Sequence, residues 1–308
     1  MIISSNTWHR VGRIAAFVLT VVCLAYFVWQ LTDSYVDVIG SFHTIGNQTT
    51  LIIAEFALML MGIVVETVRW SVIRRFFTGG TLKADIIGTL RAISLGNATP
   101  ANLGEHVGRA MGYDSKGRAF AASFIASVIQ TTAIVILGSS GSVFIWEEFS
   151  RYHTRALFSL PICLAMFIPI LLGCFLFLYI KLGAQRDKLK RFIGRRGFAS
   201  MFYTSLLLNI LKVCIFSTQL FLILNIGCHG NQFTLMATVF VYYLYVTVVP
   251  RINIIDIGIK GSLAAFFFEP FVETQFIFSA TIFIWALNII LPSVLGFISL
   301  LFRKRNAQ

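Results

Sequence analysis

Long apolar stretches dominate the chain, and short polar segments separate them. Each main stretch is close to the roughly 20 residues that a helix needs to cross the hydrocarbon core of a bilayer. The stretches are residues 14–31, 51–68, 119–145, 156–180, 202–226, 233–249 and 275–302. The first follows a basic start, but it is longer than the apolar region of a typical signal peptide, and we interpret it as a retained span.

Two weaker apolar segments, residues 84–98 and 254–268, are shorter and contain glycine. Pro100 follows the first segment, and Pro250 precedes the second. Short apolar segments interrupted by glycine or proline in both halves of a membrane protein are typical of broken or re-entrant helices. We therefore predict an all-α polytopic membrane bundle of about eight spanning or broken helices, with an inverted repeat. Residues 1–308 are expected to form one transmembrane domain.

Composition supports the membrane interpretation. The chain is 57% hydrophobic and only 12% charged, and its mean hydropathy is +0.82. Soluble domains carry roughly a quarter charged residues. A single soluble helical core of this composition would leave its exterior apolar, so the sequence argues against that class.

The net charge of +12 lies mostly between the apolar stretches. This distribution is typical of cytoplasmic loops, and nothing in it resembles a nucleic-acid surface. The basic segment 181–196 is predicted to be cytoplasmic, and segment 33–49, which lacks Lys and Arg, to lie outside. Both termini are then predicted to be cytoplasmic. This topology requires that residues 84–109 enter the membrane and return to the same side, and that residues 254–268 cross the membrane as a broken span. The basic loops are expected to attract anionic lipid headgroups.

A first motif follows the shorter apolar segment of the N-terminal half. Pro100 suits the first turn of a new helix, because its φ is fixed and it lacks an N–H. Glu105 and Arg109 are spaced i, i+4 on one helical face, and Gly104 and Gly108 allow another backbone or a ligand to approach that face.

A second motif with the same kinds of residue follows Pro250. Asp256 and Lys260 again place an acid and a base at i, i+4, beside Gly258 and Gly261. We infer two related half-sites that meet near mid-membrane. The alternative is that each pair is a structural salt bridge near a helix end, since such pairs are common in helices.

The cost of charge at membrane depth, a few kcal/mol per group, favours a functional role for these side chains. The candidate substrate-binding residues are Glu105, Arg109, Asp256, Lys260, Arg91 and Asn253. Lys212 lies within an apolar stretch and is a candidate to face a polar cavity. Glu55 is a candidate to line the path, whereas Glu66 is expected to pair with nearby arginines at the interface.

Motifs for catalysis or cofactors are not found. The chain lacks a P-loop, an HExxH sequence and a Gly-x-Ser-x-Gly sequence. Its five cysteines have neither disulfide-framework nor metal-ligand spacing. We therefore expect no cofactor and no metal, and an enzymatic function is disfavoured.

The two motifs resemble those of the lysylphosphatidylglycerol synthase transmembrane region family, also called flippase-like domain proteins. Thr99-Pro100, Gly104-Glu105 and Arg109 resemble its first signature, and the run from Pro250 to Gly261 resembles its second, with Gly261 where the usual form has an acid. The resemblance covers essentially the full length. It implies a bacterial cytoplasmic-membrane domain that moves a lipid headgroup across the bilayer, without the soluble domain that aminoacylates the lipid in the full synthases.

The favoured hypothesis is thus translocation or binding of an amphipathic lipid, such as a phospholipid or an aminoacylated or glycosylated lipid. One alternative is a membrane-embedded transferase acting on a lipid carrier, with Glu105 or Asp256 as general base. Another is a non-transporting partner of a lipid-modifying enzyme, docked through the basic loop 181–196.

Overall fold

The computed structural model describes residues 35–99, 102–111, 113, 115–152, 196–249 and 256–305, together with positions 25, 28, 29 and 32. This part of the chain is helical and contains no strand. Outside the described residues lie most of the predicted stretch 14–31, the whole stretch 156–180, nearly all of the basic loop 181–196, and the motif residues Pro100, Pro250 and Asn253.

Among the described residues, four helices are long and apolar enough to cross a membrane. They are α3 (Thr49–Phe77), α6 (Lys116–Tyr152), α9 (Phe198–Leu224), which continues into a 3₁₀ turn, and a continuous helix formed by α12 (Thr274–Trp285), the π-helical turn η5 (Ala286–Ile290) and α13 (Leu291–Arg305). They coincide with the predicted apolar stretches 51–68, 119–145, 202–226 and 275–302, whose helical nature is confirmed. The segment 33–49, predicted as an external connection, is largely helical and forms α2 (Tyr35–Gly46).

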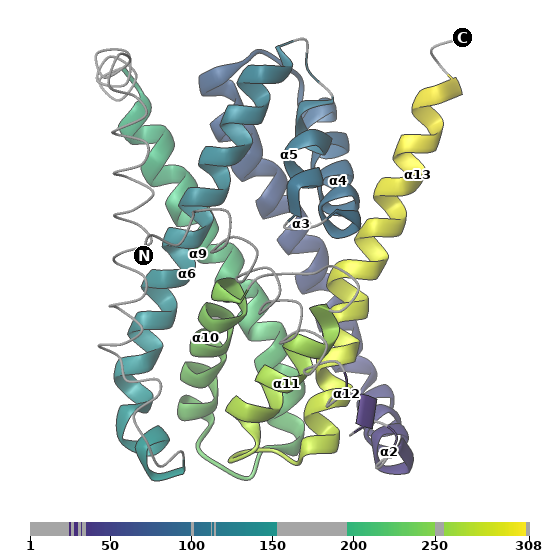
Figure 1. Cartoon of the computed structure of the whole chain (residues 1–308), viewed down its shortest axis with the longest axis vertical. Helices are drawn as coiled ribbons and strands as arrows, with labels where there is room; N and C mark the ends of the chain where they lie inside the picture. The colour runs from purple at the N-terminus through teal and green to yellow at the C-terminus, as the bar shows by residue number, and fades with distance from the viewer. Residues whose placement is uncertain are drawn as a thin grey trace, which may run out of the picture.

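A helical hairpin follows α3. Helices α4 (Leu82–Ala98) and α5 (Leu103–Ala110) lie side by side in the same half of the molecule (Figure 1). A Cβ atom added to Gly108 would lie 2.8 Å from the Cα of Ala92, and one added to Gly104 would lie 2.1 Å from the carbonyl oxygen of Leu95. The two backbones can approach this closely only because these residues are glycine. The hairpin has the shape that a dip-and-return of residues 84–109 requires, and its entry into a membrane stays a prediction.

A second pair of short helices occupies the opposite half of the molecule. Helices α10 (Gln232–Val248) and α11 (Asp256–Phe268) both lie in the lower half of Figure 1. The described part of the predicted broken span 254–268 is thus one short helix, α11, and its crossing of a membrane stays a prediction. The 13 residues of α11 reach about 20 Å, less than the roughly 30 Å of a hydrocarbon core.

The two halves of the chain repeat the same order in opposite directions. A long helix, a short hairpin and another long helix occur as α3, α4–α5 and α6, and again as α9, α10–α11 and α12–α13. In Figure 1, α3 runs upward and the first hairpin lies above, whereas α9 runs downward and the second hairpin lies below. This arrangement is the one expected of an inverted repeat.

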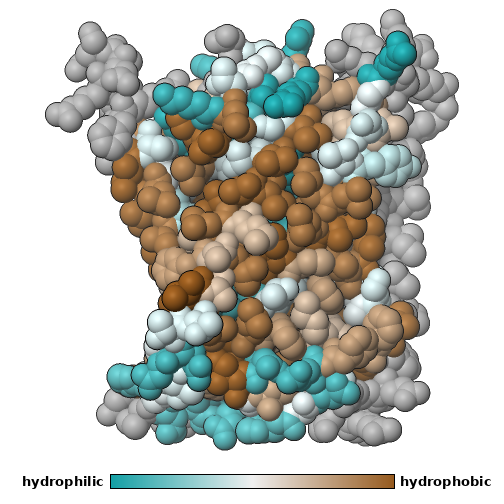
Figure 2. Space-filling view, turned by 180° about the vertical axis from the view of Figure 1, so that it is seen from behind, coloured by the Kyte–Doolittle hydropathy of each residue, from teal (hydrophilic) through white to brown (hydrophobic). Residues whose placement is uncertain are grey.

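On the face shown in Figure 2, a broad apolar belt crosses the described surface, with polar residues at both ends. Many large apolar side chains of the described helices are exposed, including Ile53, Leu60 and Val64 on α3 and Leu207 on α9. A soluble protein rarely exposes so continuous an apolar surface. Together with the four long apolar helices, the belt indicates a membrane protein.

Candidate ligand-binding cavity

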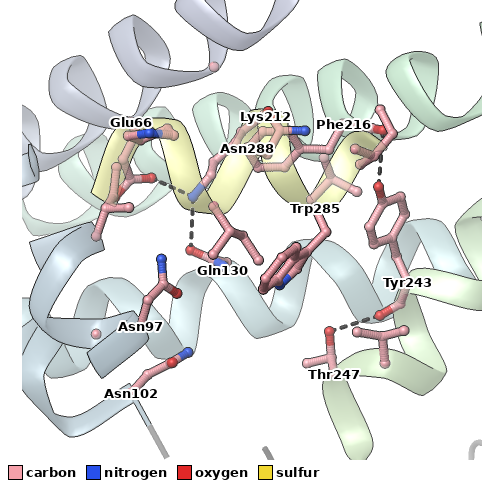
Figure 3. Close-up of a pocket in the computed structure, with 18 of the residues that line it drawn as sticks. Glu66, Asn97, Asn102, Gln130, Lys212, Phe216, Tyr243, Thr247, Trp285 and Asn288 are labelled. Carbon is pink, nitrogen blue, oxygen red and sulfur yellow. Dashed lines mark hydrogen bonds and ion pairs between the residues drawn. The ribbon is translucent and has the colours of Figure 1, made fainter. Parts of the chain in front are cut away.

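A cavity with a volume of about 280 Å³ lies where the two hairpins face each other. The first hairpin contributes Asn97 and Asn102, the second contributes Tyr243 and Thr247, and the C-terminal helix contributes Trp285. Figure 3 shows these side chains around one space, together with polar groups from the long helices. We call this space the central cavity.

Charged side chains from three helices meet at one end of the central cavity. Glu66 on α3 pairs with Lys212 on α9, whose Nζ lies 2.7 Å from Oε2, and its Oε1 accepts hydrogen bonds from Arg69 and Arg109. Arg109 on α5 also donates to Glu105 at 3.0 Å. We call these five residues the Glu66 cluster.

Polar groups from the neighbouring helices hold the Glu66 cluster in position. Arg69 donates to the Oδ1 atom of Asn209 at 3.1 Å and to the carbonyl oxygen of Ala126 at 3.0 Å. The ammonium of Lys212 lies 3.4 Å from the Oε1 atom of Gln130 (Figure 3). The guanidinium of Arg109 lies over the Trp70 ring, 4.8 Å from its centroid. The cluster is thus supported from α3, α6 and α9 as well as from the hairpin.

The Glu66 cluster has more positive than negative charge. Two carboxylates, Glu66 and Glu105, face three basic groups, Arg69, Arg109 and Lys212. Arg109 is only 2% exposed, and its Nε and Nη1 atoms have no hydrogen-bond partner among the described residues. Buried N–H groups of a charged side chain are costly to leave unsatisfied. The arrangement therefore has donor capacity for an anion at the cavity wall.

The local sequence of α5 explains how Glu105 and Arg109 reach the cavity. Asn102 adopts a left-handed φ of 57° directly before the helix, a conformation that asparagine tolerates. The Gly104 amide then donates to the Thr99 hydroxyl at 2.6 Å, which ties the helix start to the end of α4. The i, i+4 spacing places Glu105 and Arg109 on the face that looks into the cavity.

The second motif reaches the same cavity through Lys260. This residue on α11 lines the central cavity opposite the first hairpin. Gly258 and Gly261 are buried on the same helix. The side chain of Asp256, at the start of α11, lies outside the described residues. The structure thus brings Glu105, Arg109 and Lys260 to one space, and their role in binding stays a prediction.

Two predicted residues lie elsewhere. The guanidinium of Arg91 donates to the Ser299 carbonyl oxygen on α13 at 3.0 Å, and Arg91 is not among the residues that line the cavity. Glu55 is fully buried in α3 and does not line the cavity either. The predicted contact of Arg91 with a phosphate and the predicted lining of a path by Glu55 stay predictions, since neither side chain lines the central cavity.

Sequence reasoning placed Glu66 at the membrane interface, whereas the structure makes it the centre of the buried cluster. Lys212 faces the cavity, as its isolated position in an apolar stretch suggested. The amides of Gln130, Asn209 and Asn288 were missed. The available signal was the same for all of them, namely a polar side chain within a membrane-length apolar stretch.

A separate buried network lies nearer the end of α3. The carboxylate of Asp85 on α4 pairs with Arg74 through two hydrogen bonds of 2.5 and 2.8 Å and also accepts from Ser71. Tyr113 donates to it at 2.6 Å, and Trp70 donates to the Tyr113 hydroxyl at 2.9 Å. Burial, followed by the bond to Asp85, raises the pKa of Tyr113 above its ordinary value. We call this the Asp85 network; none of its five residues lines the central cavity.

In the described part of the chain, no three His, Cys, Asp or Glu side chains are grouped so that they could hold a metal ion. His106 bonds instead to the Ser123 hydroxyl at 2.8 Å and packs on Phe120.

Comparison of the whole chain with models of known protein families gives no match, and comparison with curated protein sequences gives none either.

Proposed function

We propose that this protein binds the phosphate-bearing headgroup of an amphipathic lipid in the central cavity and moves it across a bilayer. The observation on which the proposal depends is the Glu66 cluster, a buried group of charges with a positive excess at the wall of a cavity between two inverted hairpins. Charged groups at membrane depth are costly, and they mark substrate or ion pathways in most membrane proteins that contain them.

Arg109 is the residue best placed to recognise the headgroup. Its Nη2 atom is used by Glu66 and Glu105, while Nε and Nη1 have no described partner. A phosphate matches the fork geometry of a guanidinium and accepts charge-assisted hydrogen bonds from it. Lys212, paired with Glu66 and Gln130 at the cavity wall, adds a second cation.

The rest of the cavity suits an amphipathic molecule. Apolar and aromatic side chains, among them Phe216, Leu220 and Trp285, line it beside the charged end. Such a mixed lining, mostly apolar with a few convergent polar groups, is typical of small-molecule sites. The acyl chains would remain in the bilayer while the headgroup enters the cavity.

The inverted order of the two hairpins supports movement rather than static binding. In transporters built from inverted repeats, substrate sites lie at the interface between repeats, and the two halves alternate in opening to either side. We propose that the whole chain forms about eight spanning or broken helices in a bacterial cytoplasmic membrane, with both termini in the cytoplasm. The resemblance of both motifs to the flippase-like domain proteins supports the same proposal.

The proposal is tested by a headgroup-accessibility assay in proteoliposomes. Fluorescent phospholipids and glycolipids are placed in both leaflets, and a membrane-impermeant reductant reports loss of inner-leaflet protection. Wild-type protein is expected to accelerate movement of a phosphate-bearing lipid, and Arg109→Gln and Lys212→Met to reduce it strongly. Arg75→Gln is the matched control, because Arg75 is an exposed basic residue on α3.

The proposal fails if folded wild-type protein moves no lipid faster than empty vesicles do. It also fails if both cavity variants move lipid at the wild-type rate. A new covalent lipid product in the same vesicles would instead favour a transferase.

A further inference from the structure

A second buried carboxyl group, outside the Glu66 cluster, lies nearer the start of the same helix, α3. Glu55 precedes Glu66 by three helical turns on α3, about 16 Å along the axis. Its side chain has no exposed surface, and neither carboxyl oxygen has a hydrogen-bond partner among the described residues. Among these residues no basic side chain forms an ion pair with it.

The groups that face Glu55 are neutral. From α9, the Gln219 amide lies beside the carboxyl and donates to the main-chain oxygen of Glu55 at 3.1 Å. From α10, the hydroxyl of Tyr243 is within electrostatic range, and it donates to the Phe216 carbonyl oxygen at 3.1 Å. The other helices packed against α3 present no described titratable or charged side chain that acts on this carboxyl.

A carboxylate in such surroundings has neither a counter-ion nor a full set of donors. Removing the charge from water would cost many kcal/mol without compensation, so the group is expected to bind a proton instead. The Glu66 carboxylate on the same helix shows the contrast, because three basic side chains stabilise its charge.

Polar side chains connect Glu55 with the central cavity. Asn288 donates to the Oε1 atom of Gln219 at 3.1 Å, and Asn288 lines the cavity (Figure 3). Tyr243 lines it as well. Asn288 sits in the π-helical turn η5, and such turns inside longer helices occur frequently at functional sites. Gln219, through Asn288, and Tyr243 therefore link the surroundings of the enclosed carboxyl with the proposed headgroup site.

We infer that Glu55 is a proton-binding site linked to the central cavity, so that lipid movement is coupled to proton movement. In the conformation described, Glu55 is the neutral acid. Its O–H bond breaks when a change of conformation opens the carboxyl to water from the cavity and the proton passes to that water, leaving a carboxylate that accepts from the Gln219 amide. Reprotonation restores the neutral form. The proton site stands on the geometry of Glu55, whereas the coupling rests on the proposed lipid movement.

The proton site is tested first, without any lipid substrate. Infrared titration of the purified protein measures the C=O stretch of protonated carboxyl groups across a pH series. At pH 7, where ordinary Asp and Glu side chains are ionised, wild type is expected to retain this band. Glu55→Gln should abolish it, and Glu273→Gln, which removes an exposed carboxyl at the start of α12, should leave it unchanged. If the glutamine variant does not fold, Glu55→Asp provides a second variant. The band of that variant should shift in frequency.

No protonated band in wild type at pH 7, or an unchanged band in the variants of Glu55, would overturn the proton site. The coupling is then tested in proteoliposomes with and without a transmembrane pH gradient. The gradient should change the rate of lipid movement several-fold for wild type and Glu273→Gln, and not for Glu55→Gln. If the rate of lipid movement in wild type is the same with and without the pH gradient, the coupling is overturned. Failure of the proposed function gives a different result, in which no lipid moves at all while the infrared band remains.

Discussion

The Asp85 network and the Glu66 cluster are two buried groups of charges that both include residues of α3, and they differ in charge balance. In the Asp85 network one carboxylate faces one guanidinium, and both carboxylate oxygens accept two hydrogen bonds each. In the Glu66 cluster two carboxylates face three basic groups, and part of the Arg109 guanidinium has no described partner.

The two groups also differ in their position relative to the central cavity. The Asp85 network ties α3 to the start of the first hairpin and lies away from the central cavity, whereas Glu66, Glu105, Arg109 and Lys212 line it. A closed, neutral network has nothing left to offer a ligand and acts as a structural connection. An unbalanced one at a cavity wall can bind an anion. Burial of charge alone therefore does not identify a site; its unused hydrogen-bonding capacity does.

The largest effect on stability is expected from Asp85→Ala. The substitution leaves Arg74 buried without its counter-ion, and breaking a buried pair in this way costs about 3–5 kcal/mol. Thermal unfolding in detergent should show a strongly lowered midpoint or little folded protein. A midpoint equal to that of wild type would contradict the structural role of the Asp85 network.

A smaller loss is expected from Glu66→Gln. The amide keeps the shape of the side chain but removes the charge that three basic groups share. Loss of hydrogen bonds between charged partners costs about 1.5–3 kcal/mol. Because the positive excess grows, adding a soluble short-chain phospholipid should raise the unfolding midpoint of the variant more than that of wild type. Equal shifts for both proteins would argue against anion binding at this cluster.

Tyr113→Phe is a smaller change to the Asp85 network than Asp85→Ala. The change removes the donor to Asp85 and the acceptor for Trp70, while the ring packing remains. We expect a loss of about 1–2 kcal/mol in the free energy of unfolding, measured by denaturation in mixed micelles. Lipid movement should stay within twofold of wild type, since Tyr113 does not line the cavity. A large loss of lipid movement without a loss of stability would contradict the structural role of Tyr113 and place it in lipid movement instead.

The smallest effect on stability is expected from Lys212→Met. With this ammonium removed, Glu66 and Glu105 balance Arg69 and Arg109, and the methionine retains the length of the side chain. The free energy of unfolding should change by less than about 1 kcal/mol, whereas affinity for a short-chain phospholipid should fall about tenfold, which corresponds to about 1.4 kcal/mol. Calorimetric titration measures the affinity. Unchanged affinity with lowered stability would make Lys212 a structural residue.

Particular residues show how far local reasoning extends. The glycines of the first motif predicted that another backbone or a ligand approaches closely, and the i, i+4 spacing predicted that Glu105 and Arg109 share one face, because helical spacing is a local property. The same reasoning took α10 as a span and α11 as part of a broken one. When a helix is near the minimum length that spans the hydrocarbon core, its apolar character alone does not show whether it crosses the membrane or enters it and returns to the same side.

The sequence by itself determined the helical class, the membrane-length apolar stretches and the two interrupted segments, since these depend on composition and on short-range spacing. Only the tertiary structure decided that Lys212 pairs with Glu66, which lies 146 positions earlier in the chain, and that Arg109 joins them. It also decided that Glu55 stays without a partner among the described residues while Glu66 has three. The rotation of each helix and the packing of distant helices set these contacts, and neither is encoded in the spacing of residues along one segment.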